Sequence, residues 1–322
     1  RFFLTDTVFL RMPQALGYFG NLARELAAAA QWNGPNCIPA AKAQHGKGFS
    51  GEEKTVKSLL ALASARPAHP WRCAVAMRVV RARMSYMSDL VRTRKELHCR
   101  QQTLHAILWL SKAANAGSIR RVRFIDVGAS LGDCMLAASC LLPEGSLSGT
   151  MMEADPSAAA ALKGTVEING LHHAAVNKST VDLHHVFVSD KQAKTVDALF
   201  GHYGLMSPQS GAHGQLTRGV PNLKAETLDN LMAGSHESVD LLTIYVNGAE
   251  LSVLRGSDTL LRLGRIRCIL LYRPGGVDET ALDYLSSLRY RPCSSGNQAW
   301  VPPAVSSCQL CCPATSPCEG HK

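Results

Sequence analysis

A few residues near the middle of the chain have the types and spacing of a nucleoside-binding site. The stretch FIDVGASLGD, residues 124–133, predicts a buried strand that ends in a turn and leads into a helix. Gly128 lets the backbone turn, and Gly132 allows close approach of a ligand or of the helix. The next predicted strand ends in Glu153, whose carboxylate can accept hydrogen bonds from a ribose diol. The sequence therefore predicts a nucleoside cofactor at the carboxyl ends of parallel strands.

The first residue of the turn distinguishes two kinds of nucleoside cofactor. A dinucleotide fingerprint reads G-x-G-x-x-G, whereas this turn reads D-x-G-x-x-x-G, with Asp126 in place of the first glycine. The Asp126 carboxylate would repel a pyrophosphate but suits the cationic amino-acid end of S-adenosylmethionine. We therefore expect S-adenosylmethionine to bind at Asp126, Gly128, Ser130, Gly132 and Glu153. The alternative is that Asp126 caps the turn and Glu153 is merely exposed.

Six stretches of the chain together resemble one protein family. In order they are FIDVGASLGD, MMEADPSAAAALKGTVEINGL, VFVSD, AETLDNL, VDLLTIYVNGAELSVLRGSDTLL and IRCILLY. They resemble the FkbM-type methyltransferases, a branch of the class I S-adenosylmethionine-dependent fold, over roughly residues 121–291, about half of the chain. The resemblance implies methyl transfer, usually to a hydroxyl oxygen and often on a sugar or small metabolite, without a metal. It also implies that Ser189 and Asp190 lie near the adenine of the cofactor.

One motif departs from this family. Its fourth strand usually runs K-I-D-V-E-G-A-E, but this chain has TIYVNGAE at residues 243–250. An acid at this strand tip can orient a substrate hydroxyl or accept its proton. Tyr245 is a poor base at neutral pH, and Asn247 cannot take a proton. The remaining candidates for a base are His213 and His202, because the glycine-rich segment that contains them can form a lid over a substrate. The alternative is that this segment is an ordinary flexible loop.

The altered motif leaves two functions open. The chain is either an O-methyltransferase of a small hydroxyl acceptor or a decayed methyltransferase-fold protein that binds or scaffolds. In either case we expect the Tyr245 ring to narrow the acceptor side. Its hydroxyl is expected to bond to Asp126 or to a loop group.

The elements that must position these residues alternate between strand and helix. From Arg121 onward, short apolar runs such as RVRFIDV and VDLLTIYV alternate with helical stretches such as AELSVLRGSDTLLRLG. Continuous apolar strands are typical of a sheet that is covered on both faces. The alternation therefore predicts an α/β sheet, and the family resemblance implies that this sheet is Rossmann-like, of the class I methyltransferase type. The sheet is expected to be mostly parallel, with helices on both faces and an α-helical N-terminal extension.

The N-terminal part of the chain differs from the rest in charge. Residues 1–115 hold 17 Lys and Arg against 6 Asp and Glu. An apolar stripe at helical spacing predicts one or two helices over residues 71–114, ended near Gly117. Their apolar face is expected to pack on the following domain. The basic surface is either a solvated helix face or an interface for nucleic acid or an anionic membrane.

Changes in composition and the positions of Gly- and Pro-rich stretches divide the chain into four segments. We expect a poorly defined segment at 1–70, the basic helical extension at 71–118, the methyltransferase-like domain at 119–302, and a Cys-, Pro- and Ser-rich tail at 303–322. The first residue is Arg1, which indicates a fragment or a processed form, and no signal peptide is predicted. Apolar surroundings predict free thiols at Cys134, Cys140 and Cys268, which favours an intracellular, cytoplasmic location. The oligomeric state is left open.

Overall fold

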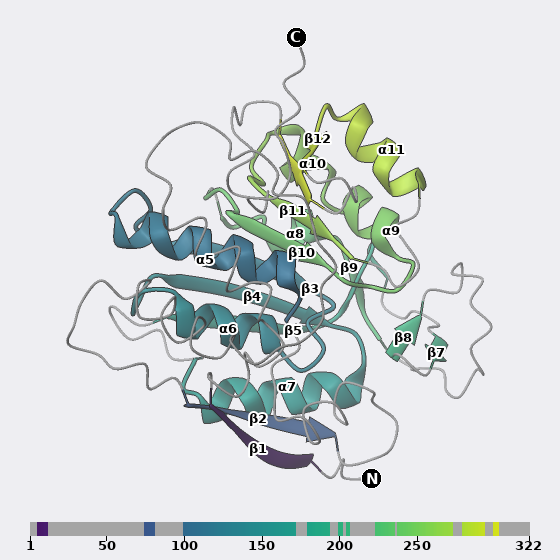
Figure 1. Ribbon diagram of the computed structural model, residues 1–322. Coiled ribbons are helices and arrows are strands. Elements are labelled where there is room, and N and C mark those ends of the chain that lie inside the picture. The colour runs from purple at the N-terminus through teal and green to yellow at the C-terminus, as the bar shows by residue number, and fades with distance from the viewer. Residues whose placement is uncertain are drawn as a thin grey trace, which may run out of the picture.

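The centre of the molecule is a seven-stranded sheet. The computed structural model describes residues 5–11, 74–80, 99–171, 179–193, 199–201, 204–206, 223–235, 237–272, 279–293 and 299–302. The sheet order is β12-β13-β11-β10-β3-β4-β5 (Figure 1). The strands are β3 Val122–Val127, β4 Leu147–Glu153, β5 Thr180–His185, β10 Leu241–Ile244, β11 Ile269–Leu271, β12 Arg291–Pro292 and β13 Ala299–Val301. Neighbours from β11 to β5 are parallel, and β13 is antiparallel to both β11 and β12. The predicted mostly parallel α/β fold is confirmed.

Helices cover both faces of this sheet. They are α5 Gln101–Asn115, α6 Asp133–Leu141, α7 Pro156–Ile168, α8 Leu228–Leu231, α9 Glu250–Arg255, α10 Asp258–Arg262 and α11 Glu279–Ser287. Apolar residues of α5, α6 and α7 form one buried cluster with the sheet. Those of α8, α9, α10 and α11 form a second cluster. Two cores explain why the strands are apolar along their whole length.

Side-chain caps mark the start of two helices, α7 and α8. Helix α7 begins where the Asp155 side chain accepts the backbone N–H groups of Ser157 and Ala158, with Pro156 at the first helical position. The single helix predicted over residues 249–264 is instead two helices, α9 and α10, separated at Gly256. A Cβ at Gly256 would lie 2.0 Å from the Ser189 carbonyl oxygen, so the break brings this backbone against a distant loop.

Short strands outside the main sheet flank its carboxyl edge. Strand β6, Phe187–Val188, pairs in parallel with β9, Ala225–Glu226. Strands β7, Leu199–Gly201, and β8, Gly204–Met206, form an antiparallel pair. The apolar pattern of HHVFVSD, residues 184–190, indicates one strand, but the structure has β5 beginning earlier, at Thr180, and a separate short strand β6. A two-residue strand holds too little pattern for sequence periodicity to detect.

The predicted N-terminal helix is wrong at its beginning. Residues Ala74–Val80 form strand β2, which pairs antiparallel with β1, Thr5–Arg11, and β2 packs against α7 (Figure 1). A run of β-branched and apolar residues fits either structure, and pairing with a segment over sixty residues earlier decides it. Helix α5 does pack on the following domain, because Leu104, Ile107 and Leu110 lie in the first core cluster. The segment boundaries remain a prediction.

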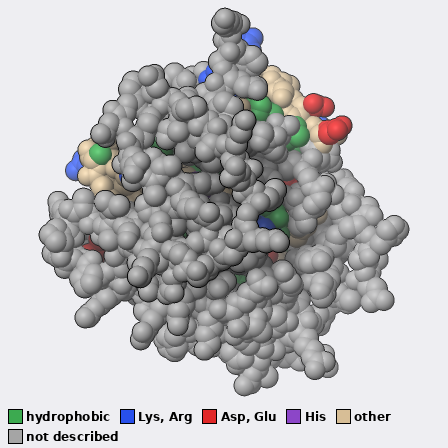
Figure 2. All heavy atoms as spheres, viewed as in Figure 1, with side chains coloured by type: hydrophobic (Ala, Val, Ile, Leu, Met, Phe, Trp, Pro, Cys, Tyr) green, Lys and Arg blue, Asp and Glu red, His purple; other side chains and the backbone are tan. Residues whose placement is uncertain are grey.

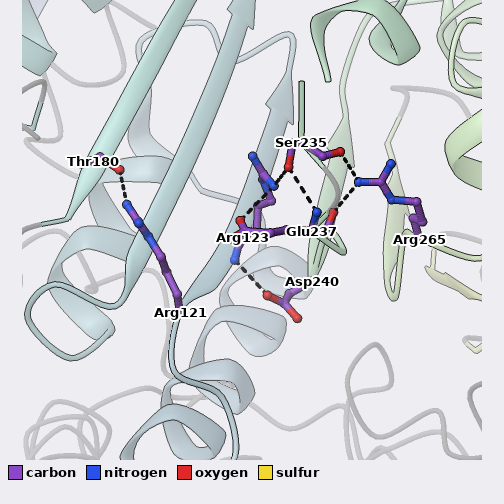
Figure 3. Close-up of polar contacts among 7 residues, drawn as sticks. All are labelled: Arg121, Arg123, Thr180, Ser235, Glu237, Asp240 and Arg265. Carbon is purple, nitrogen blue, oxygen red and sulfur yellow. Dashed lines mark hydrogen bonds and ion pairs between the residues drawn. The ribbon is translucent and has the colours of Figure 1, made fainter. Parts of the chain in front are cut away.

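A polar network holds the amino ends of the strands, opposite the glycine turn (Figure 3). Asp240, just before β10, accepts the backbone N–H of Arg123 at 2.9 Å and the guanidinium of Arg267 at 2.9 Å. The Arg123 side chain bonds to the Ser235 hydroxyl and pairs with Glu237 at 3.0 Å. These contacts join β3 to β10 and so support the register on which the carboxyl edge depends.

The cysteines contradict the expectation of free thiols. Cys134 forms a disulfide with Cys99, and Cys140 and Cys268 are disulfide-bonded as well. The prediction failed because an apolar pattern is typical of buried half-cystines as well as of buried thiols. Disulfides persist in oxidising compartments, so the argument for a reducing compartment fails, and a cytoplasmic location remains an untested prediction. Among the described residues, no helix has the length and apolar character needed to cross a bilayer.

Candidate cofactor site

The register of β3 and β10 places a buried carboxyl beside a hydroxyl. Asp126 lies opposite Thr243, and the Thr243 hydroxyl donates a hydrogen bond to its Oδ1. Burial raises the pKa of Asp126 to about 7. The hydroxyl bond opposes this shift, and the nearby charge of Asp133 adds to it. Asp126 therefore changes its charge near neutral pH.

Glu153 lies at the carboxyl end of β4 and is buried, so the alternative of a merely exposed side chain is wrong. Its two oxygens accept the backbone N–H groups of Ser130 at 2.6 Å and Asp155 at 2.8 Å. Burial raises the pKa of Glu153 to about 7, although these bonds oppose the shift. The backbone N–H of Ala154 is a third donor to this carboxylate. Because two carboxylate oxygens have about four lone-pair sites, at least one site remains for a further hydrogen bond.

The two glycines of the turn serve close packing. Gly128 has a φ of 81°, and a Cβ there would lie 2.0 Å from the Tyr245 carbonyl oxygen. Gly132 has a φ of 83°, and a Cβ there would lie 2.5 Å from the Leu162 side chain. Both φ values lie in the left-handed region that favours glycine. The turn is therefore pressed between the tip of β10 and helix α7.

The backbone amides of the turn have partners within the protein. Gly128 and Ala129 both donate to the Met152 carbonyl, at 2.9 and 3.1 Å, and Gly132 donates to Ala129 at 2.8 Å. Ser130 donates to Glu153. A turn that cradles a pyrophosphate needs such amides to face the ligand. This turn instead combines occupied amides with a buried carboxyl, which is unsuited to an anionic group.

Asp190 lies on the segment that follows β5 and passes beside Glu153. Val186 donates to the Glu153 carbonyl at 3.0 Å, and the chain then runs through β6 to Asp190. The Asp190 carboxylate accepts the hydroxyls of Ser189 and Ser252, both at 3.1 Å, which ties it to α9. Among the described residues, no hydrogen bond joins Asp190 to Asp126 or Glu153.

The acceptor-side candidates have different positions. Tyr245 follows β10 beside Gly128, and its hydroxyl accepts a hydrogen bond from Arg100 at 3.0 Å. The expected Asp126 partner is therefore wrong, whereas Arg100, in the loop before α5, fits the alternative of a loop group. Burial raises the pKa of Tyr245 above its ordinary value of 10.0, which the adjacent Arg100 opposes. Asn247 has a φ of 49° in the turn after β10. His202 and His213 lie outside the described residues.

Sequence reasoning missed three residues at this edge. Tyr272 follows β11, and the rule that ligands lie beyond strand ends could have found it. Asp133 is buried at the start of α6, and it lies within the quoted motif but was not among the residues assigned to the cofactor. Arg100 is 145 positions from Tyr245, and its place in a basic segment gave no sign of this contact.

The basic N-terminal interface is not tested by the described residues. Among the side chains coloured in Figure 2, no continuous basic area is visible on this face, and acidic side chains gather beside α11. Most arginines of residues 71–114 lie outside the part of the chain whose side chains are described. An interface for nucleic acid or an anionic membrane therefore remains a prediction.

The site fits a nucleoside cofactor with a cationic amino-acid end. Oδ1 of Asp126 is engaged by Thr243, whereas Oδ2 makes no hydrogen bond with another described residue. Glu153 retains acceptor capacity for a ribose diol. Within the described ranges, no group of three His, Cys, Asp or Glu side chains could hold a metal ion.

The comparison with solved structures finds similarity in fold to several methyltransferases. Methyltransferase FkbM from Methylobacillus flagellatus KT aligns at 15% identity and a TM-score of 0.38, over 67% of this chain and 60% of that chain. The SAH-bound Podospora anserina methyltransferase PaMTH1 aligns at 13% identity and 0.37, over 79% and 97%. The METTL16 methyltransferase domain aligns at 16% identity and 0.36, over 66% and 76%. No protein-family model and no curated protein matches the sequence.

Proposed function

We propose that this chain is an S-adenosylmethionine-dependent methyltransferase. One observation carries the proposal: two buried carboxyls, Asp126 and Glu153, lie at the carboxyl ends of adjacent parallel strands, beside a turn whose amides are occupied. This arrangement suits a ligand that is cationic at one end and has a diol at the other. It does not suit a dinucleotide.

Each part of the cofactor has a candidate partner in the chain. Asp126 would hold the amino group of the methionine end, and Glu153 would hold the ribose hydroxyls. Ser189 and Asp190 would lie at the adenine end. When bound, S-adenosylmethionine supplies the electrophilic methyl group. The protein then contributes by holding two reactants in one orientation, which alone lowers a barrier by several kcal/mol.

The acceptor group in this proposal is a hydroxyl of a sugar or small metabolite. The described groups on the acceptor side do not supply a strong base, because the Tyr245 hydroxyl has a raised pKa and bonds to Arg100. In the transfer, the acceptor hydroxyl oxygen would bond to the methyl carbon as the sulfur–methyl bond breaks. S-adenosylhomocysteine would be the leaving group, and the hydroxyl proton would pass to water. Positioning of the acceptor therefore matters more here than removal of its proton.

The proposal predicts that Glu153→Gln weakens S-adenosylhomocysteine binding about ten- to hundredfold. The amide keeps the size of the side chain but loses the charge that strengthens its hydrogen bonds, which are worth about 1.5 to 3 kcal/mol. Isothermal titration calorimetry measures the change. Glu167→Gln, at an exposed position on α7, is the matched control and should bind as the wild type does. Equal binding by both variants, or no binding by the wild type, would contradict the cofactor assignment.

A decayed methyltransferase-fold module is the second candidate, and the occupied Tyr245 hydroxyl favours it. The double change Tyr245→Asp with Asn247→Glu restores the acids of the related motif. If the present site is a working one, we expect turnover to fall, because the ring that packs beside Arg100 is lost. Methyl transfer from labelled S-adenosylmethionine to small hydroxyl acceptors, both neutral and anionic, measures this. A rise in turnover with unchanged cofactor affinity would support the decayed module.

A further inference from the structure

Arg100 lies over the carboxyl edge of the sheet between two tyrosines. Its guanidinium carbon is 3.6 Å from the ring centroid of Tyr272 and 5.3 Å from that of Tyr245. The two rings meet edge to face with centroids 4.8 Å apart. Tyr245 and Tyr272 directly follow β10 and β11, so Arg100 lies where these strands point.

The position of Arg100 is set by the fold. Arg100 directly precedes α5, whose inner face is buried in the first core cluster. The preceding residue, Cys99, is joined by a disulfide to Cys134 at the start of α6, just after the glycine turn. Two constraints therefore hold this guanidinium close to the turn and the tip of β10.

The charge of Arg100 is not neutralised within the described part of the chain. It has no carboxylate partner there, and the first turn of α5 holds no acidic residue. Its one side-chain hydrogen bond goes to the neutral Tyr245 hydroxyl. A guanidinium has five N–H donors, so donors remain for a ligand. A half-buried arginine stacked on an aromatic ring is a typical receptor for carboxylate or phosphate.

The neighbouring residues are consistent with an anionic ligand. Where the related motif has two acids, this chain has Tyr245 and Asn247, so no carboxylate at the tip of β10 repels an anion. The acids nearby are Asp126, Asp133 and Glu250, and all three are buried. The negative charge of Asp133 acts on Tyr245, but the half-buried side chains at this edge carry one fixed positive charge and otherwise neutral hydrogen-bonding groups.

We propose that Arg100 binds a carboxylate or phosphate group of the methyl acceptor, so that the acceptor is an anionic hydroxyl compound. This inference rests on the proposed function, because it takes the tips of β10 and β11 as the acceptor side. The guanidinium fixes the acceptor by its charge, and the tyrosine rings pack against its body.

Binding of matched probes to the full-length, non-reduced protein saturated with S-adenosylhomocysteine tests this assignment. The probes are 4-hydroxybenzoate against 4-hydroxybenzyl alcohol, and glucuronate against glucose. Calorimetry or saturation-transfer NMR should show that the carboxylate member of at least one pair binds roughly ten- to hundredfold tighter. Equal binding within both pairs, or no binding of any probe, overturns the proposal.

Three variants test whether Arg100 causes the preference for carboxylate probes over neutral ones. Arg100→Met keeps an apolar stem on the Tyr272 ring but removes the charge, and should abolish the preference. Arg100→Lys should retain only part of the preference, because an ammonium lacks the coplanar N–H donors with which a guanidinium binds both oxygens of a carboxylate. Arg121→Ala removes an arginine that bonds to Thr180 at the opposite edge, and should leave the preference unchanged.

S-adenosylmethionine itself carries a carboxylate, which is a second possible ligand of Arg100. The same variants distinguish the carboxylate of the cofactor from that of the acceptor. Arg100→Met should bind S-adenosylhomocysteine within about twofold of the wild type. If it instead loses tenfold or more while the probe preference persists, Arg100 holds the cofactor, and the acceptor assignment is wrong. If the wild type does not bind S-adenosylhomocysteine at all, the proposed function fails, whereas the carboxylate preference can still be measured on the protein alone.

Discussion

The Gly128→Ala variant is expected to lose about 4 kcal/mol or more of its free energy of unfolding. The φ of 81° is unfavourable for a residue with a Cβ, and this alone costs about 1 to 2 kcal/mol. The larger part comes from the Tyr245 carbonyl oxygen, which would lie 2.0 Å from the new methyl group. That oxygen belongs to backbone, so β10 must shift away from β3. Urea denaturation followed by circular dichroism measures the change.

The control for this variant is Gly117→Ala. Gly117 has a similar φ of 74°, but no atom lies within 4 Å of the position of its Cβ. It should therefore lose only the backbone part, about 1 to 2 kcal/mol. Equal losses at the two positions would show that the close approach of Gly128 to Tyr245 contributes nothing to stability. S-adenosylhomocysteine binding should also be lost in Gly128→Ala and retained in Gly117→Ala.

The second large effect is a pH dependence that Asp126→Asn should remove. The pKa of Asp126 is 3.8 without burial and about 7 in the folded protein. Between these values the folded state binds a proton that the unfolded state has lost, so stability falls as pH rises from about 4 to 7. At 1.36 kcal/mol per pKa unit, the loss reaches at most about 4 kcal/mol. Above pH 7 both states are ionised, and this contribution no longer changes.

Asn at position 126 keeps an oxygen for the Thr243 hydroxyl but cannot ionise. The variant should therefore match the wild type near pH 4 and exceed its free energy of unfolding at pH 8. Glu153, whose pKa is also raised to about 7, leaves a residual slope in both proteins. Asp182→Asn, at an exposed position on β5, controls for the removed charge. Identical slopes in wild type and Asp126→Asn would contradict a raised pKa at Asp126.

Much of the fold follows from local sequence pattern. Apolar runs at residues 122–127 and 241–244 are strands because each can be buried on both faces. The stretches LGDCMLAASCLL, PSAAAALKGTVEING and ETALDYLSSL have helical spacing, and α6, α7 and α11 lie within them because this periodicity is a local feature. The placement of Asp126 and Glu153 at strand ends also needed no tertiary information, because parallel strands share one carboxyl edge.

Pairing between distant segments was decided by the tertiary structure, because the local sequence pattern does not show it. Strand β2 is a strand because β1 pairs with it, and Cys134 is a half-cystine because Cys99 lies next to it in space. The same holds for the acceptor side. Arg100 looks like one basic surface residue among many in the sequence, but packing of α5 and the disulfide bring its guanidinium onto Tyr245 and Tyr272. Sequence spacing identifies residues that share an element, whereas contacts between elements far apart in the chain depend on how the two cores are packed.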